Sequence, residues 1–127
     1  LSIHKEAEKA AVALECARDQ GRFDALHALL FANQSRQYIP DLKKYARLAS
    51  VPEPERFDRC LEEDVYGDRV RRDMEVGLSI GISGTPTVIV GRYDKRSGML
   101  RGEIISGVRS EATFSGLLDK YLALAKR

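Results

Sequence analysis

The sequence has no tryptophan, two cysteines and two histidines among its 127 residues. It also has no apolar run near the roughly 20 residues that a membrane-spanning helix needs, so the sequence predicts no membrane span. The 21 basic and 19 acidic residues are mixed along the chain, and the formal net charge is +2. Because a nucleic-acid partner is usually marked by a basic block or stripe, this mixture predicts none.

Several motifs of catalytic chemistry are also missing. The sequence contains no Cys-x-x-Cys pair, no glycine-rich phosphate loop followed by lysine, and no nucleophile elbow. His4 is expected at the start of a helix and His27 beside an apolar stripe, and neither has cysteine or carboxylate ligands at an ordered spacing. We therefore expect no catalytic residue, no metal site and no cofactor within this chain.

The first part of the chain is predicted to be helical. Apolar residues recur at helical spacing in four segments, and a further short helix is expected around Phe57, Cys60 and Leu61. Pro40 suits the first turn of its helix, and the two prolines within 51–54 interrupt helical geometry. The four longer helices are predicted at residues 4–20, 22–33, 40–49 and 65–78.

The character of the sequence changes at Gly81. Residues 81–86 favour turns, and the β-branched run 87–90 that follows indicates a strand. After a polar loop at 94–98, a second strand is expected at 101–106, and Ser110 is placed to cap a final helix. The predicted fold class is therefore α/β, with a helical domain at residues 1–80 and a β-hairpin with a C-terminal helix at residues 81–127.

The strand at 87–90 indicates a larger sheet than these residues supply. Neighbouring strand residues point to opposite faces, so the consecutive Val88, Ile89 and Val90 imply that both faces are covered. One other strand is expected, and a two-stranded hairpin alone is marginally stable in water. Further strands would come from residues outside this chain or from a second copy in a homodimer. The alternative is a lone hairpin that packed helices cover on both sides.

Thr85 and Pro86 stand directly before this strand. Proline takes a cis peptide bond at modest cost, and a cis bond would leave the N–H and C=O of the preceding residue pointing outward. An exposed backbone edge of that kind can hydrogen-bond an extended peptide. An ordinary trans proline at a strand start is the alternative, and the local sequence alone does not separate the two.

Three segments resemble one known family. The run 81–91, GISGTPTVIVG, is similar to the cis-proline loop and following strand of the DsbA-like thiol:disulfide oxidoreductases of the thioredoxin superfamily. The segment 13–30, ALECARDQGRFDALHALL, resembles the helix pair inserted into the thioredoxin fold of that family, and 57–61, FDRCL, resembles its usual pattern. The segments occur in the family's order and span almost the whole chain.

The resemblance implies a partial thioredoxin-like fold that lacks the family's redox site. That site is a Cys-x-x-Cys pair at a helix N-terminus, where the thiol pKa is lowered. Thr85 and Pro86 are the functional positions that carry over, as the loop that binds the substrate backbone. Cys16 and Cys60 resemble a structural disulfide of the family, and a redox couple or two reduced, buried cysteines are the alternatives. A disulfide would place the protein in the periplasm or outside the cell.

Three functions follow as expectations. The resemblance implies that the complete protein is a thiol:disulfide oxidoreductase acting on protein or peptide substrates with thiols or disulfides, and that this chain alone is inactive. A non-catalytic module that keeps the peptide-binding loop is the second interpretation. The third is a glutathione-dependent enzyme of the same fold, as in kappa-class transferases, which the threonine before Pro86 and the two cysteines in helices disfavour.

Overall fold

A computed structural model describes residues 6–125 of the chain, in two compact units. The first unit covers Leu1–Val76 and the second Gly77–Arg127. The assignment of residues 1–80 to a helical insertion and of 81–127 to the end of a thioredoxin-like domain stays a prediction. His4 lies outside the described residues.

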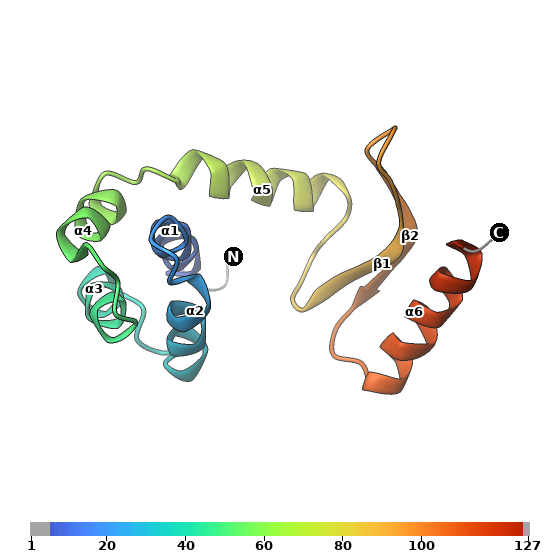
Figure 1. The fold of residues 1–127 in the computed structure, drawn as a ribbon, viewed down its shortest axis with the longest axis horizontal. Helices are drawn as coiled ribbons and strands as arrows, with labels where there is room; N and C mark the ends of the chain where they lie inside the picture. The colour runs from blue at the N-terminus through green and yellow to red at the C-terminus, as the bar shows by residue number, and fades with distance from the viewer. Residues whose placement is uncertain (1–5, 126–127) are drawn as a thin grey trace. The chain divides into compact units, whose positions relative to one another are not determined.

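Helices make up the first unit (Figure 1). Gly21 follows the first helix with a φ of +67°, a conformation that glycine adopts without strain. Pro40 and Pro54 lie in the first turns of their helices, where a missing N–H costs little. The helices are α1 Ala7–Arg18, α2 Phe23–Ala32, α3 Ile39–Leu48, α4 Pro54–Glu62 and α5 Gly67–Ser79, the last of which crosses the boundary between the units.

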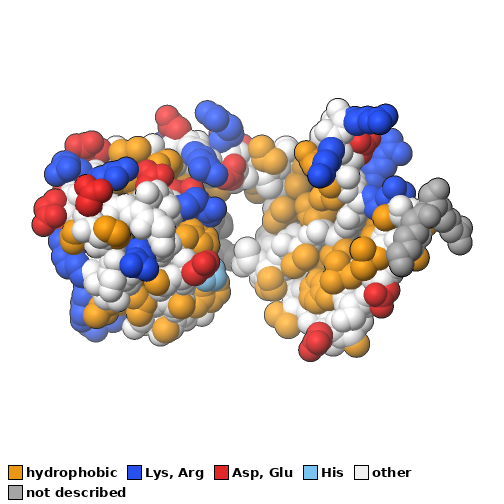
Figure 2. Space-filling view, viewed as in Figure 1, with side chains coloured by type: hydrophobic (Ala, Val, Ile, Leu, Met, Phe, Trp, Pro, Cys, Tyr) orange, Lys and Arg blue, Asp and Glu red, His pale blue; other side chains and the backbone are white. Residues whose placement is uncertain are grey.

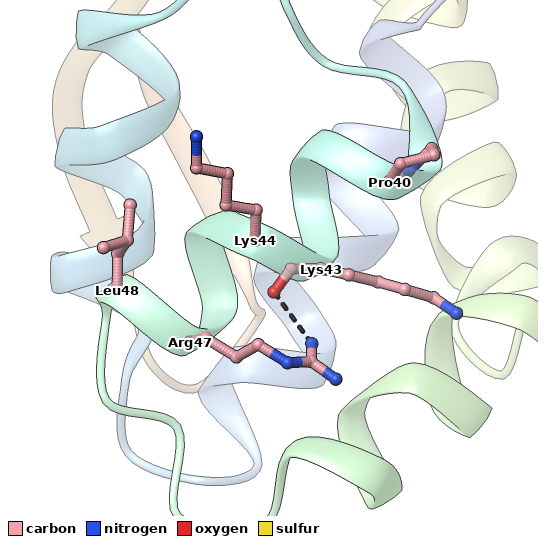
Figure 3. A pocket seen from close by; sticks show the side chains of 5 residues that line it. All are labelled: Pro40, Lys43, Lys44, Arg47 and Leu48. Atoms are coloured by element: carbon pink, nitrogen blue, oxygen red, sulfur yellow. Dashed lines mark hydrogen bonds between the residues drawn. The ribbon is translucent and has the colours of Figure 1, made fainter.

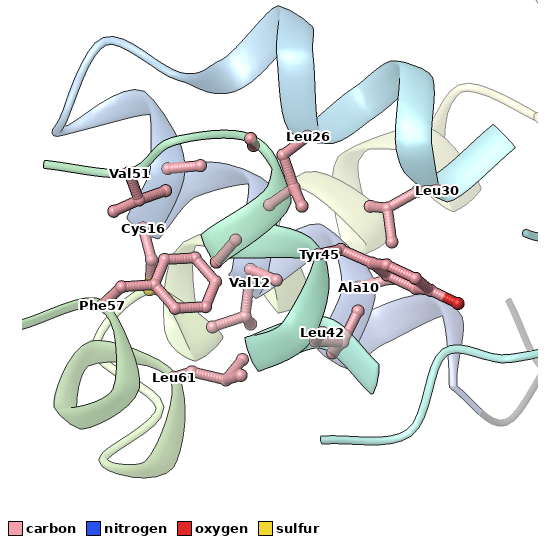
Figure 4. Close-up of a cluster of buried hydrophobic side chains, with 14 of the residues drawn as sticks. Ala10, Val12, Cys16, Leu26, Leu30, Leu42, Tyr45, Val51, Phe57 and Leu61 are labelled. Carbon is pink, nitrogen blue, oxygen red and sulfur yellow. The ribbon is translucent and has the colours of Figure 1, made fainter. Parts of the chain in front are cut away.

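One hydrophobic core holds these helices together. Its large side chains come from all of the first four helices and are fully buried, with Phe57 of α4 directed toward Val12 of α1 in Figure 4. Burying a side chain of this size contributes about 1.5–3 kcal/mol relative to leaving it in water. The largest fully buried side chains are Phe57, Leu26, Leu42, Leu61, Val12 and Cys16.

Ion pairs connect the start of α5 to α1. Arg71 pairs with Glu8 at 2.9 Å, with Asp68 at 2.8 Å and with Asp64 at 3.1 Å, and Lys9 reaches Asp64 at 2.8 Å. The hydrogen bond from Lys9 holds the pKa of Asp64 below its usual range, and the bond from Arg71 adds to that effect. These pairs connect the two ends of the first unit.

The second unit contains a β-hairpin and a helix, as predicted. Strand β1, Thr87–Asp94, pairs antiparallel with β2, Met99–Ser106, and α6, Glu111–Ala125, follows. Ser110 caps α6, since its Oγ accepts a hydrogen bond from the Thr113 N–H at 3.3 Å. Both strands are longer than predicted, because Asp94 closes the turn tightly by accepting bonds from the Arg96 N–H and the Ser97 hydroxyl, each at 2.8 Å.

Little of the second unit is buried. Val90 is its one buried apolar residue among those described, and none of the residues in α6 is buried. Val88, which we expected to be covered, has 40% of its surface exposed. The expectation that both faces of β1 are covered is therefore not met within the described residues. None of the described helices has the length and apolar character of a membrane span.

Candidate substrate-binding loop

Thr85 and Pro86 form an exposed loop directly before β1, and the peptide bond between them is cis. Two hydrogen bonds hold the loop in place. The Gly107 N–H donates to the Pro86 carbonyl at 2.8 Å, and the Thr87 hydroxyl donates to the Gly84 carbonyl at 2.7 Å. The loop is thus fixed to the end of β2 on one side and to its own turn on the other.

The backbone of Thr85 has no partner within residues 6–125. Neither its N–H nor its C=O makes a hydrogen bond there, although the groups on either side are bonded. Exposed backbone groups on a rigid segment that leads into a strand are what an extended peptide can pair with. The arrangement can therefore bind a peptide main chain.

A groove runs along β1 beside this loop. It is lined by β1 from Val88 to Tyr93 and by one side of α6, has a volume of about 570 Å³, and includes no residue of β2. Leu118 and Leu122 of α6 are 54% and 60% exposed there. The apolar side chains of α6 therefore stay partly uncovered along β1 among the described residues.

Cys16 and Cys60 are joined by a disulfide that links α1 to α4 across 44 residues of sequence. Cys16 is buried in the core and Cys60 is half-buried. Both lie in the C-terminal halves of their helices, away from the N-termini whose partial positive charge lowers a thiol pKa. The chain thus has no free thiol in the structure.

Two of the three cations in a second hollow are already paired. An open hollow on α3 is lined by Lys43, Arg47 and Lys44 with two apolar residues (Figure 3). Lys43 pairs with Glu62, and Arg47 forms a two-pronged bond with Asp58 at 3.1 and 2.8 Å, so the hollow has little net positive charge.

No cluster of metal ligands occurs in the described part of the chain. The ring of His27 is exposed and lies between the rings of Phe23 and Phe31, at centroid distances of 5.7 and 4.6 Å. The sequence predicts its place beside an apolar stripe, and in the structure its ring contacts these two aromatic rings.

Comparison with known protein families matches residues 2–120 to the thioredoxin family. The chain belongs to the thioredoxin family. Its α/β fold, with helices followed by a two-stranded sheet and a C-terminal helix, agrees with part of a thioredoxin-like fold and confirms the predicted fold class. Membership supports a redox or disulfide role in general and does not by itself specify the DsbA-like branch.

Two curated proteins are similar over 88 residues of this chain. They are Na(+)/H(+) antiporter NhaA 3 of Salinispora tropica, at 34% identity, and Na(+)/H(+) antiporter NhaA 1 of Salinispora arenicola, at 35%. The match covers 69% of this chain and 13% of each antiporter. The chain thus spans a small part of the length of these relatives, and their names describe those whole proteins.

One residue that supports the loop was missed in the sequence. Gly107 supplies the N–H that holds the Pro86 carbonyl, and its φ of +78° is one that glycine adopts readily. A glycine directly after a predicted strand is a signal for such a turn. It gives no indication, however, of which distant carbonyl the turn will meet.

Proposed function

We propose that this chain is the helical and C-terminal part of a DsbA-like thiol:disulfide oxidoreductase, in which Thr85 and Pro86 bind the main chain of a protein substrate. The observation that carries the proposal is the unpartnered backbone of Thr85 on a loop that hydrogen bonds fix on both sides, in a chain of the thioredoxin family. The redox cysteines would be contributed by residues other than these 127.

The open side of β1 supports the same proposal. Its groove has an apolar lining and lacks a neighbouring strand within residues 6–125, as expected if further strands of a thioredoxin-like sheet lie there. A sheet completed in this way would place the substrate loop at the edge of a rigid scaffold, and rigid placement is what a binding loop needs. A second copy of the chain is the other source of strands.

The test separates backbone recognition from side-chain recognition. In the natural full-length protein, Thr85→Pro removes the N–H that a peptide would pair with, and Thr85→Ala keeps it. We expect Thr85→Pro to raise the KM for insulin reduction on the order of tenfold, the effect of one lost hydrogen bond, and Thr85→Ala to change it by less than about twofold. Equal effects of the two variants would contradict a backbone contact.

Three measurements on the full-length protein, insulin reduction, peptide binding and glutathione binding, distinguish the three functions. Insulin reduction by the wild-type full-length protein supports the oxidoreductase. Peptide binding that Thr85→Pro weakens, without any reduction of insulin, would replace it with a non-catalytic binding module. Saturable binding of glutathione, with no binding of peptides, would replace it with a glutathione-dependent enzyme.

We further propose that the protein matures in an oxidising compartment, the periplasm or the cell exterior. The supporting observation is the pairing of Cys16 with Cys60, because disulfides persist in such compartments and are rare in the cytosol. Thiol titration of the unfolded protein, purified without reductant from its natural host, tests this directly. Two titratable thiols from this region would contradict the proposal.

A further inference from the structure

The outer half of the hairpin, residues 92–101, is strongly basic. It carries four cationic side chains, those of Arg92, Lys95, Arg96 and Arg101, and all four are exposed. None of them forms an ion pair with another described residue, whereas Lys43, Arg47 and Arg71 of the first unit all do. Figure 2 shows basic side chains gathered at this end of the second unit.

Two of these cations face each other directly. Arg92 of β1 is the register partner of Arg101 of β2, and like charges in that position destabilise a hairpin. Neither nearby carboxylate relieves the repulsion. Asp94 is engaged by the turn, and Glu103 pairs with Lys120 and accepts a hydrogen bond from the Tyr121 hydroxyl at 3.0 Å. A like-charged pair without a counterion among the described residues leaves its positive charge available to an anionic partner.

The opposite face of the same hairpin end is apolar. Tyr93 and Leu100 are register partners there, and their side chains are 63% and 47% exposed. Met99, the register partner of Asp94, is also exposed and lies on the same face as Arg92 and Arg101. The groove beneath α6 ends at Tyr93 and Ala125, and Figure 1 shows the turn of the hairpin reaching beyond α6. No element of the second unit covers this end among the described residues.

We propose that the hairpin end formed by residues 92–101 docks on an anionic phospholipid surface. Its arginines and lysine suit lipid phosphates, and an exposed tyrosine beside leucine and methionine suits the boundary between headgroups and acyl chains. A nucleic acid or an acidic protein segment would use the cations and leave Tyr93, Leu100 and Met99 in water. The combination of cations with adjacent apolar side chains therefore favours a membrane.

Vesicle co-sedimentation of the natural full-length protein tests the proposal. The probes are vesicles of phosphatidylcholine alone and vesicles of phosphatidylcholine and phosphatidylglycerol in equal parts. Two double variants, R92Q/R101Q in the strands and K95Q/R96Q in the turn, each remove two cations. The matched control, R36Q/K44Q, removes two exposed cations of the first unit that make no ion pair with a described residue. Far-UV circular dichroism confirms that each variant is folded.

We expect the wild type to prefer the phosphatidylglycerol vesicles, with an affinity that falls as salt is raised. Each removed cation should weaken binding about fivefold, so each hairpin variant should lose on the order of 25-fold while the control changes by less than about twofold. An equal loss in the control overturns the proposal, because net charge alone would then explain binding. So does equal binding to both vesicles, or binding to polyglutamate or duplex DNA without binding to vesicles.

Discussion

The two units of this chain differ in how far their own residues bury their apolar side chains. In the first unit the large apolar side chains of the first four helices meet in one core, and a disulfide and several ion pairs connect its ends. In the second unit Val90 is the one buried apolar residue among those described, and the apolar stripe of α6 is half uncovered. The first unit therefore has a core of its own, whereas the second buries little of its apolar surface within the described residues.

Truncation of a core side chain should lower the unfolding free energy of the first unit much more than that of the second. Phe57→Ala removes a fully buried ring of the first unit and should cost about 3–5 kcal/mol of unfolding free energy. Phe114→Ala removes a half-exposed ring of α6 and should cost about 1 kcal/mol or less. Urea unfolding followed by far-UV circular dichroism measures both. Equal losses would show that the second unit has a core as well packed as the first.

Removing the disulfide should have the next largest effect. Cys16→Ala with Cys60→Ala frees a loop of 44 residues in the unfolded chain, and the chain-entropy account gives a loss of about 4 kcal/mol, within a usual range of about 2–4. The same denaturant titration, with and without reductant, measures it. Reductant should destabilise the wild type and leave the double variant unchanged. A wild type that reductant does not affect would contradict the structure.

A smaller effect is expected at Asp64. Asp64→Asn removes its charge, and asparagine tolerates the positive φ of 54° at this position, so the loss at neutral pH should be under about 1 kcal/mol. The pKa of Asp64 is lowered in the folded chain, so its contribution is present above the ordinary aspartate pKa near about 4 and is lost as the pH falls below it. The difference in unfolding free energy between wild type and Asp64→Asn should therefore shrink as the pH is lowered below about 4. Asp68→Asn, at a more exposed carboxylate, is the control.

The smallest effect should come from the uncovered half of α6. Leu122→Ser, at a side chain that is 60% exposed, should change the stability of this chain by less than about 0.5 kcal/mol. It should reduce the binding of a dye that reports exposed apolar surface, because Leu122 lines the groove along β1. A loss of several kcal/mol would show that the side chain is buried by this chain alone and would contradict an incomplete sheet.

The helices were predictable because their apolar periodicity and their prolines are local signals. Ser110 as a cap and the strand from Thr87 were predictable for the same reason. The length of β1 was not, because the tight turn depends on the side chain of Asp94 bonding to residues that follow it. Thr85 and Pro86 as a substrate-binding loop stay a prediction, and the bond from Gly107 that holds the Pro86 carbonyl joins residues brought together by strand pairing. Sequence periodicity has no information on such a contact.

The Cys16–Cys60 bond has a consequence for fragmentation of the chain. The residues between these two positions, which include α2 and α3, lie within one covalent loop. A protease that cuts the exposed connection at residues 34–36 therefore leaves both pieces attached to each other. Such a nicked chain should migrate as one species on a non-reducing gel and separate into two when the gel is reduced.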